Sequence, residues 1–235
     1  MVSIPRDTYV TIPPYGDGKG GNKDKINAAY TYGGMPLLIR TVEKLSDVKV
    51  DHTVTIGFNG FKTMTAAVGG VDVMVDETTT DPRSKRTFKK GINHLEGEAA
   101  LDYVRQRYGL PNGDFDRQKR QQIFAKALLK KATSTGTLTN PVKLNALIDA
   151  ASKAVTVDKE LSIPDMALQF KNLRSDDITF MAMPNAGTET IDGVSYVKSD
   201  KEKASALFLA MKNDKMATWI KQNPPKDKTN ADGGS

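Results

Sequence analysis

Two hydrophobic periodicities alternate along this chain of 235 residues, and they limit the folds that it can adopt. Residues 71–75 place an apolar side chain at every second position, as a strand with one buried face does. Residues 114–132 repeat apolar side chains at spacings of three and four, as an amphipathic helix does. Because segments of both kinds follow one another, the sequence predicts an α/β fold with helices on both faces of a central mixed sheet, a three-layer α/β/α sandwich.

The same patterns predict where the elements lie. We expect strands at residues 2–4, 50–56, 71–75, 178–183 and 194–197, and helices from about Pro36, over 59–68, 95–104 and 114–132, from Pro141, and over 201–211. Residues 13–24 are rich in glycine and lysine, which indicates a loop. We expect one domain over residues 1–221 and a disordered polar tail over residues 222–235.

The amino-acid composition limits which binding partners and metal sites are expected. The net charge of +6 favours phosphate groups, nucleic acid or acidic lipid headgroups, although surplus surface lysine is the simpler explanation. The absence of cysteine excludes disulfides and thiolate metal sites. His52 is expected to pack on a strand and His94 to help cap a helix, and neither lies in a catalytic-triad motif. Nucleic acid is disfavoured because few aromatic residues are interleaved with the basic ones.

Arginines gather around the start of the helix expected at residues 114–132. Arg105 and Arg107 precede a short loop, and Arg117, Arg120 and Gln121 follow in the first turns of the helix. A buried arginine without a partner costs free energy, whereas guanidinium groups and a helix N-terminus both suit an anion. The pattern therefore predicts a pyrophosphate clamp in phosphoryl transfer.

Ion pairing is the alternative for these arginines, and the spacing favours neither interpretation. The candidate carboxylates are Glu96, Glu98, Asp114 and Asp116. Asp114 is also expected to cap the helix.

A second candidate cluster lies near the N-terminus. Arg6 and Asp7 directly follow an expected strand, where α/β proteins commonly bind ligands. Lys25 and Asn27 precede the turn at Gly33-Gly34 and could reach a ligand from the next loop. Each of these residues also has a simpler explanation when it is taken singly. Arg6 and Asp7 could form a surface ion pair after a proline turn, Lys25 could be a solvated lysine, and Asn27 could cap a helix.

In their order along residues 1–132, these segments resemble the LytR-CpsA-Psr family. The matching segments are Ser3-Ile4-Pro5-Arg6-Asp7-Thr8, Lys25 to Tyr30 with Gly33-Gly34, Val50-Asp51-His52, Gly69-Gly70-Val71, Leu95 to Arg107, Asp114 to Arg117, and Arg120-Gln121. The resemblance implies an α/β/α sandwich with a hydrophobic pocket for a polyprenyl tail. Arginines on its rim would hold the pyrophosphate of the lipid.

The resemblance also assigns roles to residues. It implies catalytic roles for Arg6, Arg105, Arg107 and Arg117. It implies substrate binding by Lys25, Arg120, Gln121, Asp7 and Asn27. Magnesium is expected to assist, but the family's metal-binding aspartates, one of them the probable base, would lie upstream of residue 1. We therefore expect no metal ligands here, and weak magnesium binding and impaired activity of this stretch alone.

The implied function is a phosphotransferase that moves a glycopolymer such as teichoic acid from a polyprenyl pyrophosphate lipid to a sugar hydroxyl of peptidoglycan. The family resemblance further implies an extracytoplasmic protein, held at the bacterial membrane by an N-terminal anchor upstream of Met1. The sequence itself shows no signal peptide and no run of roughly 20 apolar residues. The alternative function is a non-catalytic module that binds polyprenyl phosphate or an anionic polymer.

Overall fold

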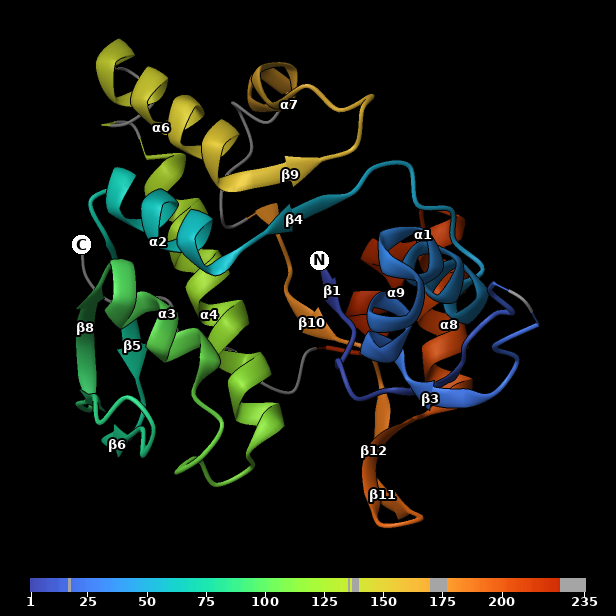
Figure 1. The fold of residues 1–235 in the computed structure, drawn as a ribbon. Helices are drawn as coiled ribbons and strands as arrows, with labels where there is room; N and C mark the ends of the chain where they lie inside the picture. The colour runs from blue at the N-terminus through green and yellow to red at the C-terminus, as the bar shows by residue number, and fades with distance from the viewer. Residues whose placement is uncertain (17, 135, 137–139, 170–176, 225–235) are drawn as a thin grey trace. The chain divides into compact units, whose positions relative to one another are not determined.

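A computed structural model describes residues 1–16, 18–134, 136, 140–169 and 177–224 of the chain. They form a mixed α/β fold whose contacts divide it into two compact units (Figure 1). Among the described residues, unit 1 combines residues 1–51 with 181–224, and unit 2 contains residues 52–169 and 177–180. The predicted α/β class is confirmed. Each unit is considered by itself below.

Unit 1 is built from both ends of the sequence. Its elements are β1 (Val2–Ser3), β2 (Tyr9–Thr11), β3 (Lys23–Lys25), α1 (Ile26–Ser46), β10 (Met181–Ala182), β11 (Asn185–Ile191), β12 (Val194–Ser199), α8 (Lys201–Lys212) and α9 (Met216–Gln222). β1 pairs with β10 in parallel, and β2–β3 and β11–β12 are antiparallel pairs. Thr8 bridges to Val197, which brings β12 beside the start of β2.

Helix α1 contains a sharp kink. Gly33 and Gly34 have non-helical backbone angles, and the φ of +63° at Gly34 is one that glycine adopts without steric cost. Pro36 then lies in the first turn of the second segment, where its missing N–H is not needed. The predicted helix from about Pro36 is therefore present, and a preceding helical segment from Ile26 was not expected.

Unit 1 has two apolar clusters. One joins β2 to the inner side of α1 through Val10, Ile12, Ala29 and Leu37. The other packs Met183 against α8. Because Val10 and Ile12 are buried while Tyr9 and Thr11 are partly exposed, the β2 segment presents one apolar and one polar face.

Unit 2 holds the centre of the sequence. Its elements are β4 (Val54–Ile56), α2 (Phe58–Ala67), β5 (Val71–Val75), β6 (Thr79–Thr80), β7 (Thr87–Phe88), β8 (Gly91–Leu95), α3 (Gly97–Arg105), α4 (Asp114–Ala132), α6 (Pro141–Ala154), β9 (Val155–Val157) and α7 (Ile163–Gln169). The expected helices at 59–68 and 114–132 are confirmed, and the alternating valines of β5 are buried at every second position as predicted.

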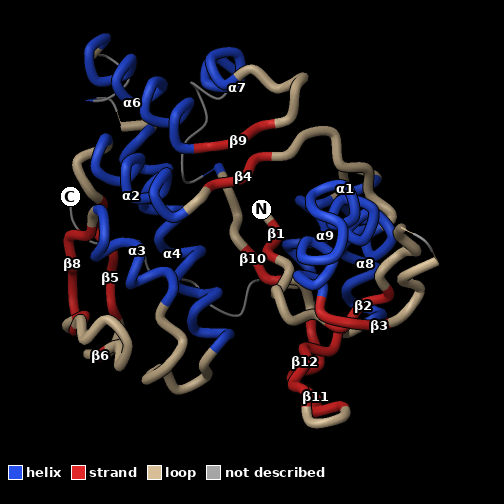
Figure 2. Tube along the Cα trace, viewed as in Figure 1, coloured by secondary structure: helices blue, strands red, loops and turns tan. Residues whose placement is uncertain are grey.

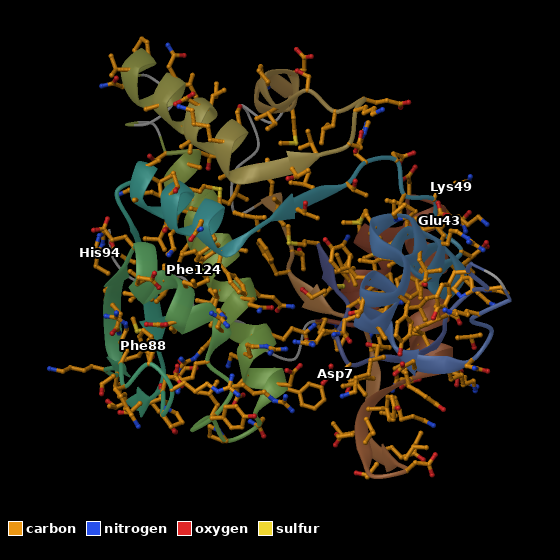
Figure 3. The ribbon with its side chains drawn as sticks, viewed as in Figure 1. Asp7, Glu43, Lys49, Phe88, His94 and Phe124 are labelled. Atoms are coloured by element: carbon orange, nitrogen blue, oxygen red, sulfur yellow. The ribbon has the colours of Figure 1, made fainter. Side chains whose placement is uncertain are left out.

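The core of unit 2 lies between the β5–β8 ribbon and helices α3 and α4. Phe88, Tyr103 and Phe124 are almost fully buried there, and Figure 3 labels the two phenylalanines. The predicted inward stripe of α4 is largely correct, since Phe124 and Arg120 are buried and Ile123, with its apolar neighbours on the stripe, packs against the core.

The strands are short, as the red segments of Figure 2 show, and the sheets of the described residues each have two strands. β4 pairs with β9, β5 with β8, and β6 with β7, all antiparallel. A single central mixed sheet is thus seen only in pieces, and the lipid pocket stays a prediction. Among the described residues, no helix has both the length and the apolar composition that a membrane span requires.

Three local predictions were wrong. His94 lies in strand β8, where its Nδ1 is 2.8 Å from Asp72 Oδ1 on β5, and does not cap a helix. His52 precedes β4 instead of lying within a strand, because only residues 54–56 of the expected strand pair. Asp114 is the first residue of α4, and Gly113 is the N-cap. Most of the expected tail lies outside the described residues, and Gln222 ends helix α9.

Candidate functional site

The end of α3 and the start of α4 are joined by hydrogen bonds of polar side chains, of which Gln106 and Arg120 are buried and Gln121 is exposed. Gln106 is 1% exposed; its Oε1 accepts a hydrogen bond from Arg120 Nη1 (2.5 Å), and its Nε2 donates to the carbonyl of Tyr108 (3.2 Å). Gln121 Nε2 donates to the carbonyl of Val104 at 3.1 Å. These bonds hold the segment that carries Arg105 and Arg107 against the first turns of α4.

Arg120 lies inside unit 2 and has its own set of partners. Its Nη2 donates to Thr79 Oγ1 at 2.6 Å, and its guanidinium carbon lies 4.6 Å from the ring centroid of Tyr103 and 5.4 Å from that of Phe88. Burial lowers the pKa of Arg120 and raises the pKa of Tyr103 to about 12. Neutral hydrogen-bond acceptors and aromatic faces thus surround this arginine. Its predicted contact with substrate stays a prediction.

Arg107 and Arg117 approach the same carboxylate oxygen. Asp114 Oδ1 is 2.5 Å from Arg117 Nη2 and 4.0 Å from Arg107 Nε. This oxygen is buried, and its contact with Arg117 has the distance of an ion pair without the geometry of a hydrogen bond. The structure therefore combines the two interpretations of the spacing: the arginines converge, and they do so on a carboxylate.

The two arginines differ in their access to solvent. The Arg107 side chain is 46% exposed, whereas that of Arg117 is 15% exposed. Asp114, which both arginines approach, is the first residue of α4, where the helix dipole favours an anion. Asp116 also lies in this first turn, so the helix start carries two carboxylates beside the two guanidinium groups.

Arg105 is placed elsewhere on the same unit. Its guanidinium carbon lies 4.2 Å from the ring centroid of Phe58, the exposed first residue of α2. The predicted group of arginines is thus divided among three environments: the interior for Arg120, the Asp114 carboxylate for Arg107 and Arg117, and an aromatic face for Arg105.

In unit 1, the predicted residues near the N-terminus form a second charged cluster. Asp7 is 8% exposed, and its carboxylate lies 3.3 Å from Arg6 Nε and 3.4 Å from Lys25 Nζ. The cluster forms because the Asn27 N–H donates to the Arg6 carbonyl and the Ile26 N–H donates to the Thr8 carbonyl. Figure 3 labels Asp7 on unit 1.

Sequence reasoning named Asp114 among the carboxylates that could pair with the arginines, and it is the one that both Arg107 and Arg117 approach. It missed one participant in these clusters. Tyr196 was not considered, yet the Lys25 ammonium lies 5.6 Å from its ring centroid. Lys25 and Tyr196 are far apart along the chain, so no local sequence pattern predicts this contact.

Magnesium was expected from the family resemblance. The part of the chain that the structure describes contains no group of three or more histidine, aspartate or glutamate side chains that could hold a metal ion. Asp7 and Asp114, the acidic residues of the two clusters, already face cationic side chains. These residues do not form a magnesium site by themselves.

The structure thus defines a mixed α/β protein in which two guanidinium groups meet at the start of one helix. The chain belongs to the LytR-CpsA-Psr family, since the model described as the LytR_cpsA_psr family matches residues 1–213. This match confirms the resemblance seen in the sequence and extends it well beyond residue 132.

Several curated proteins are similar to the chain. The cell wall biosynthesis protein LcpA of Corynebacterium glutamicum is 37% identical over 232 positions, which cover 88% of this chain and 44% of LcpA. A protein of Bacillus cereus named polyisoprenyl-teichoic acid–peptidoglycan teichoic acid transferase TagU is 38% identical over 197 positions, covering 83% of this chain and 61% of TagU. The chain thus spans roughly half of the length of these relatives.

Solved structures of related proteins have the same fold. Bacillus subtilis TagV matches with a TM-score of 0.75 and 31% identity, covering 92% of this chain and 82% of TagV. A structure described as TagT bound to LI-WTA matches with a TM-score of 0.69 and 29% identity, covering 91% of this chain and 77% of TagT.

Proposed function

We propose that this chain is the catalytic part of a phosphotransferase that moves a glycopolymer from a polyprenyl pyrophosphate lipid to a sugar hydroxyl of peptidoglycan. Family membership and the names of the relatives support glycopolymer transfer to the cell wall. The lipid donor and the acceptor hydroxyl are the finer part of the proposal, and they follow from the family resemblance.

The observation that carries the proposal is the convergence of Arg107 and Arg117 on Asp114 Oδ1. Two guanidinium groups approach one buried carboxylate oxygen, and a more strongly charged ligand would compete with Asp114 for their N–H groups. A pyrophosphate has more acceptor oxygens than Asp114 and suits the planar guanidinium fork. In this proposal the headgroup takes over donors that Asp114 holds in the unliganded protein.

The proposed reaction is a displacement at phosphorus. The acceptor hydroxyl oxygen forms a bond to the phosphorus that carries the glycopolymer, and the bond from that phosphorus to the bridging oxygen breaks. Polyprenyl phosphate leaves with that oxygen, and the hydroxyl proton passes to a base. The arginines would neutralise the charge that develops on the phosphoryl and leaving oxygens, which is the main task in phosphoryl transfer.

Arg107 and Arg117 would bind the headgroup, while Gln106, Arg120 and Gln121 keep the α3–α4 junction in place. Arg6, Asp7, Lys25 and Asn27 stay predicted headgroup contacts in unit 1. Magnesium dependence, membrane anchoring and an extracytoplasmic location also belong to the proposal.

A non-catalytic module for polyprenyl phosphate or an anionic polymer is the second candidate. It is favoured by the ion pairs of Asp7, because this carboxylate already faces the two cationic side chains of Arg6 and Lys25. The two functions differ in turnover: only the enzyme converts a pyrophosphate lipid to the lipid monophosphate in the presence of an acceptor.

The first test measures binding of geranyl pyrophosphate, a short soluble pyrophosphate lipid. Replacing Arg107 by glutamine removes one charged hydrogen-bond donor group while leaving an exposed side chain. We expect the Kd to rise by about tenfold to a hundredfold, because a hydrogen bond to a charged group contributes roughly 1.5–3 kcal/mol. Isothermal titration calorimetry measures the change, and the substitution Arg83→Gln, at an exposed arginine of unit 2, is the matched control.

Arg117 needs a second variant, because its loss would strand a buried carboxylate oxygen. We therefore compare Arg117→Gln with the double variant Arg117→Gln/Asp114→Asn, which removes the stranded charge. Both are expected to bind geranyl pyrophosphate more weakly than the wild type, and the double variant is expected to retain the wild-type melting temperature. Unchanged affinity in the Arg107 variant and in the double variant would rule out the clamp.

A further inference from the structure

One face of unit 1 collects lysine and tyrosine side chains from three segments. Tyr9 lies opposite Lys25 in the β2–β3 pair, and Thr11 lies opposite Lys23, so these four side chains point to the same side. Thr8 bridges in parallel to Val197, so the residues that flank Val197 on β12 belong to the face of Tyr9. The opposite face carries buried Val10 and Val197, which ties this arrangement to the core.

Aromatic rings hold the ammonium groups of this face in place. Lys23 Nζ and Lys198 Nζ lie 5.7 Å and 5.5 Å from the ring centroid of Tyr9, and Lys25 Nζ lies 5.6 Å from that of Tyr196. The two tyrosine rings are themselves 4.6 Å apart between centroids. Because cation–π contacts restrict the lysine side chains, the ammonium groups form an ordered array. We call Tyr9, Tyr196, Lys23, Lys25 and Lys198 the lysine–tyrosine face.

Carboxylates compensate this array only in part. Lys198 Nζ is 2.7 Å from Glu189 and Lys25 Nζ is 3.4 Å from Asp7. Lys23 is exposed and has no ion-pair partner among residues 1–16, 18–134, 136, 140–169 and 177–224. Asp24, between the two lysines of β3, accepts instead from Tyr32 Oη at 2.7 Å. Lys23 therefore presents an ammonium group without a paired carboxylate in the described part of the chain, beside phenol groups that can donate and accept hydrogen bonds.

We propose that the lysine–tyrosine face binds the sugar–phosphate or polyol–phosphate repeats of the anionic glycopolymer. This inference rests on the proposed function and names the part of the protein that would hold the polymer rather than its lipid. Phosphodiesters of the polymer would pair with Lys23 and Lys198, and the hydroxyl groups of the repeat would bond to the tyrosine phenols. The apolar ring faces and edges suit the C–H groups of the repeat unit.

The side chains of this face favour a polymer over a lipid. All five are polar or amphipathic, and the apolar residues of β2 are on the buried side. The face also includes Lys25, whose partner Asp7 belongs to the predicted headgroup cluster in unit 1. A chain of phosphodiesters can contact several separated ammonium groups at once, whereas a single headgroup cannot.

The test uses the 235-residue chain and soluble poly(glycerol phosphate) without a lipid. The double variant Lys23→Gln/Lys198→Gln removes two ammonium groups and leaves Arg6, Asp7 and Lys25 in place. We expect its Kd for the polymer to rise by about tenfold at low ionic strength, with a shallower dependence of binding on salt. Its Kd for geranyl pyrophosphate is expected to stay within about twofold of the wild type.

The matched control is Lys44→Gln/Lys49→Gln, which removes the same charge from exposed lysines of unit 1. Figure 3 shows Lys49 well separated from Asp7 within that unit. This control is expected to bind the polymer like the wild type. A second pair of variants tests the Tyr9 ring. Tyr9→Phe removes the phenol and keeps the ring, so it is expected to weaken polymer binding less than Tyr9→Leu, because leucine cannot hold the lysines by cation–π contacts.

Several outcomes would overturn the inference. The first is a wild-type affinity of the Lys23→Gln/Lys198→Gln variant for the polymer. The second is an equal loss of polymer affinity in the Lys44→Gln/Lys49→Gln control. The third is binding of neutral dextran by the wild type as tight as its binding of poly(glycerol phosphate). Loss of binding to phosphatidylglycerol vesicles without loss of polymer binding would instead assign the face to a membrane. Polymer binding that depends on Lys23 and Lys198, in a chain that does not bind geranyl pyrophosphate, would support this inference and contradict the proposed function.

Discussion

Arg117 and Arg120 are three residues apart on α4, yet their surroundings differ. Arg117 meets a carboxylate at the helix start, whereas Arg120 donates to Gln106 and Thr79 and packs on two aromatic rings. A buried guanidinium is tolerated only where several donors are satisfied. Arg120 is therefore best understood as a residue that positions the α3–α4 junction.

Replacing Arg120 by methionine tests that role. The change retains much of the side-chain volume but leaves Gln106 Oε1 and Thr79 without their donor. We expect the free energy of unfolding to fall by about 2–3 kcal/mol, because unsatisfied buried polar groups are costly. Urea denaturation measures it, with Lys130→Met, on the exposed side of the same helix, as the control.

The same variant separates a positioning role from ligand binding. Wild-type stability together with lost geranyl pyrophosphate binding would make Arg120 a headgroup ligand, as the family resemblance implied. Lower stability together with retained binding at saturating ligand would make it a positioning residue.

At the scale of elements, the β4–β9 pair depends on one side chain. Asp158 follows β9, and its carboxylate accepts hydrogen bonds from the backbone N–H of Thr53 (2.6 Å) and Glu160 (3.1 Å). The pKa of Asp158 is lowered to about 2, mainly by the hydrogen bond from the Thr53 N–H. His52 and the Glu160 N–H lower it further. The hydrogen bonds of a charged carboxylate thus support the pairing of two short strands that are distant in sequence.

This lowered pKa predicts a pH dependence. The stabilisation is present above the ordinary aspartate pKa of 3.8, and it is lost as the pH falls through that value toward about 2. At pH 7 we expect Asp158→Asn to lower the melting temperature by a few degrees, and the difference from the wild type to shrink as the pH approaches 2. Thermal melts across this range measure it.

Asp51→Asn is the control, since Asp51 is exposed and makes no hydrogen bond or ion pair in the described part of the chain. It should leave the melting temperature unchanged at every pH. If Asp158→Asn had the melting temperature of the wild type at pH 7, the hydrogen bonds of the Asp158 carboxylate would not stabilise the fold.

At the scale of the whole molecule, the two units have separate cores. The apolar cluster around Phe124 and Phe88 lies within unit 2, and the clusters around Leu37 and Phe208 lie within unit 1. Trp219, the single tryptophan of the sequence, is on α9 and reports on unit 1 alone.

Separate cores predict separable unfolding. Phe124→Ala empties a buried site in unit 2 and should destabilise that unit by about 3–5 kcal/mol. We expect the circular dichroism signal to acquire an earlier transition in urea while the Trp219 fluorescence midpoint changes little. The reciprocal variant Phe208→Ala should shift the fluorescence midpoint. Equal shifts of both signals in both variants would show that the chain unfolds as one cooperative unit.

Local patterns predicted several elements and failed for others. The alternation in residues 71–75 and the helical spacing in residues 114–132 each need one buried face, so they are visible in the sequence. β2, β3 and β8 were missed, because short strands are defined by their partners more than by their own residues. The kink at Gly33-Gly34 was recognised only as a turn.

By itself, the sequence determined the α/β class, the helix that carries Arg117 and Arg120, and the family, because these depend on periodicity and on ordered local motifs. Only the tertiary structure decided which arginine enters the interior, which carboxylate receives Arg107 and Arg117, and which tyrosines order the lysines of β3 and β12. Those contacts join residues far apart along the chain, and burial and distance between such residues arise only when the chain has folded.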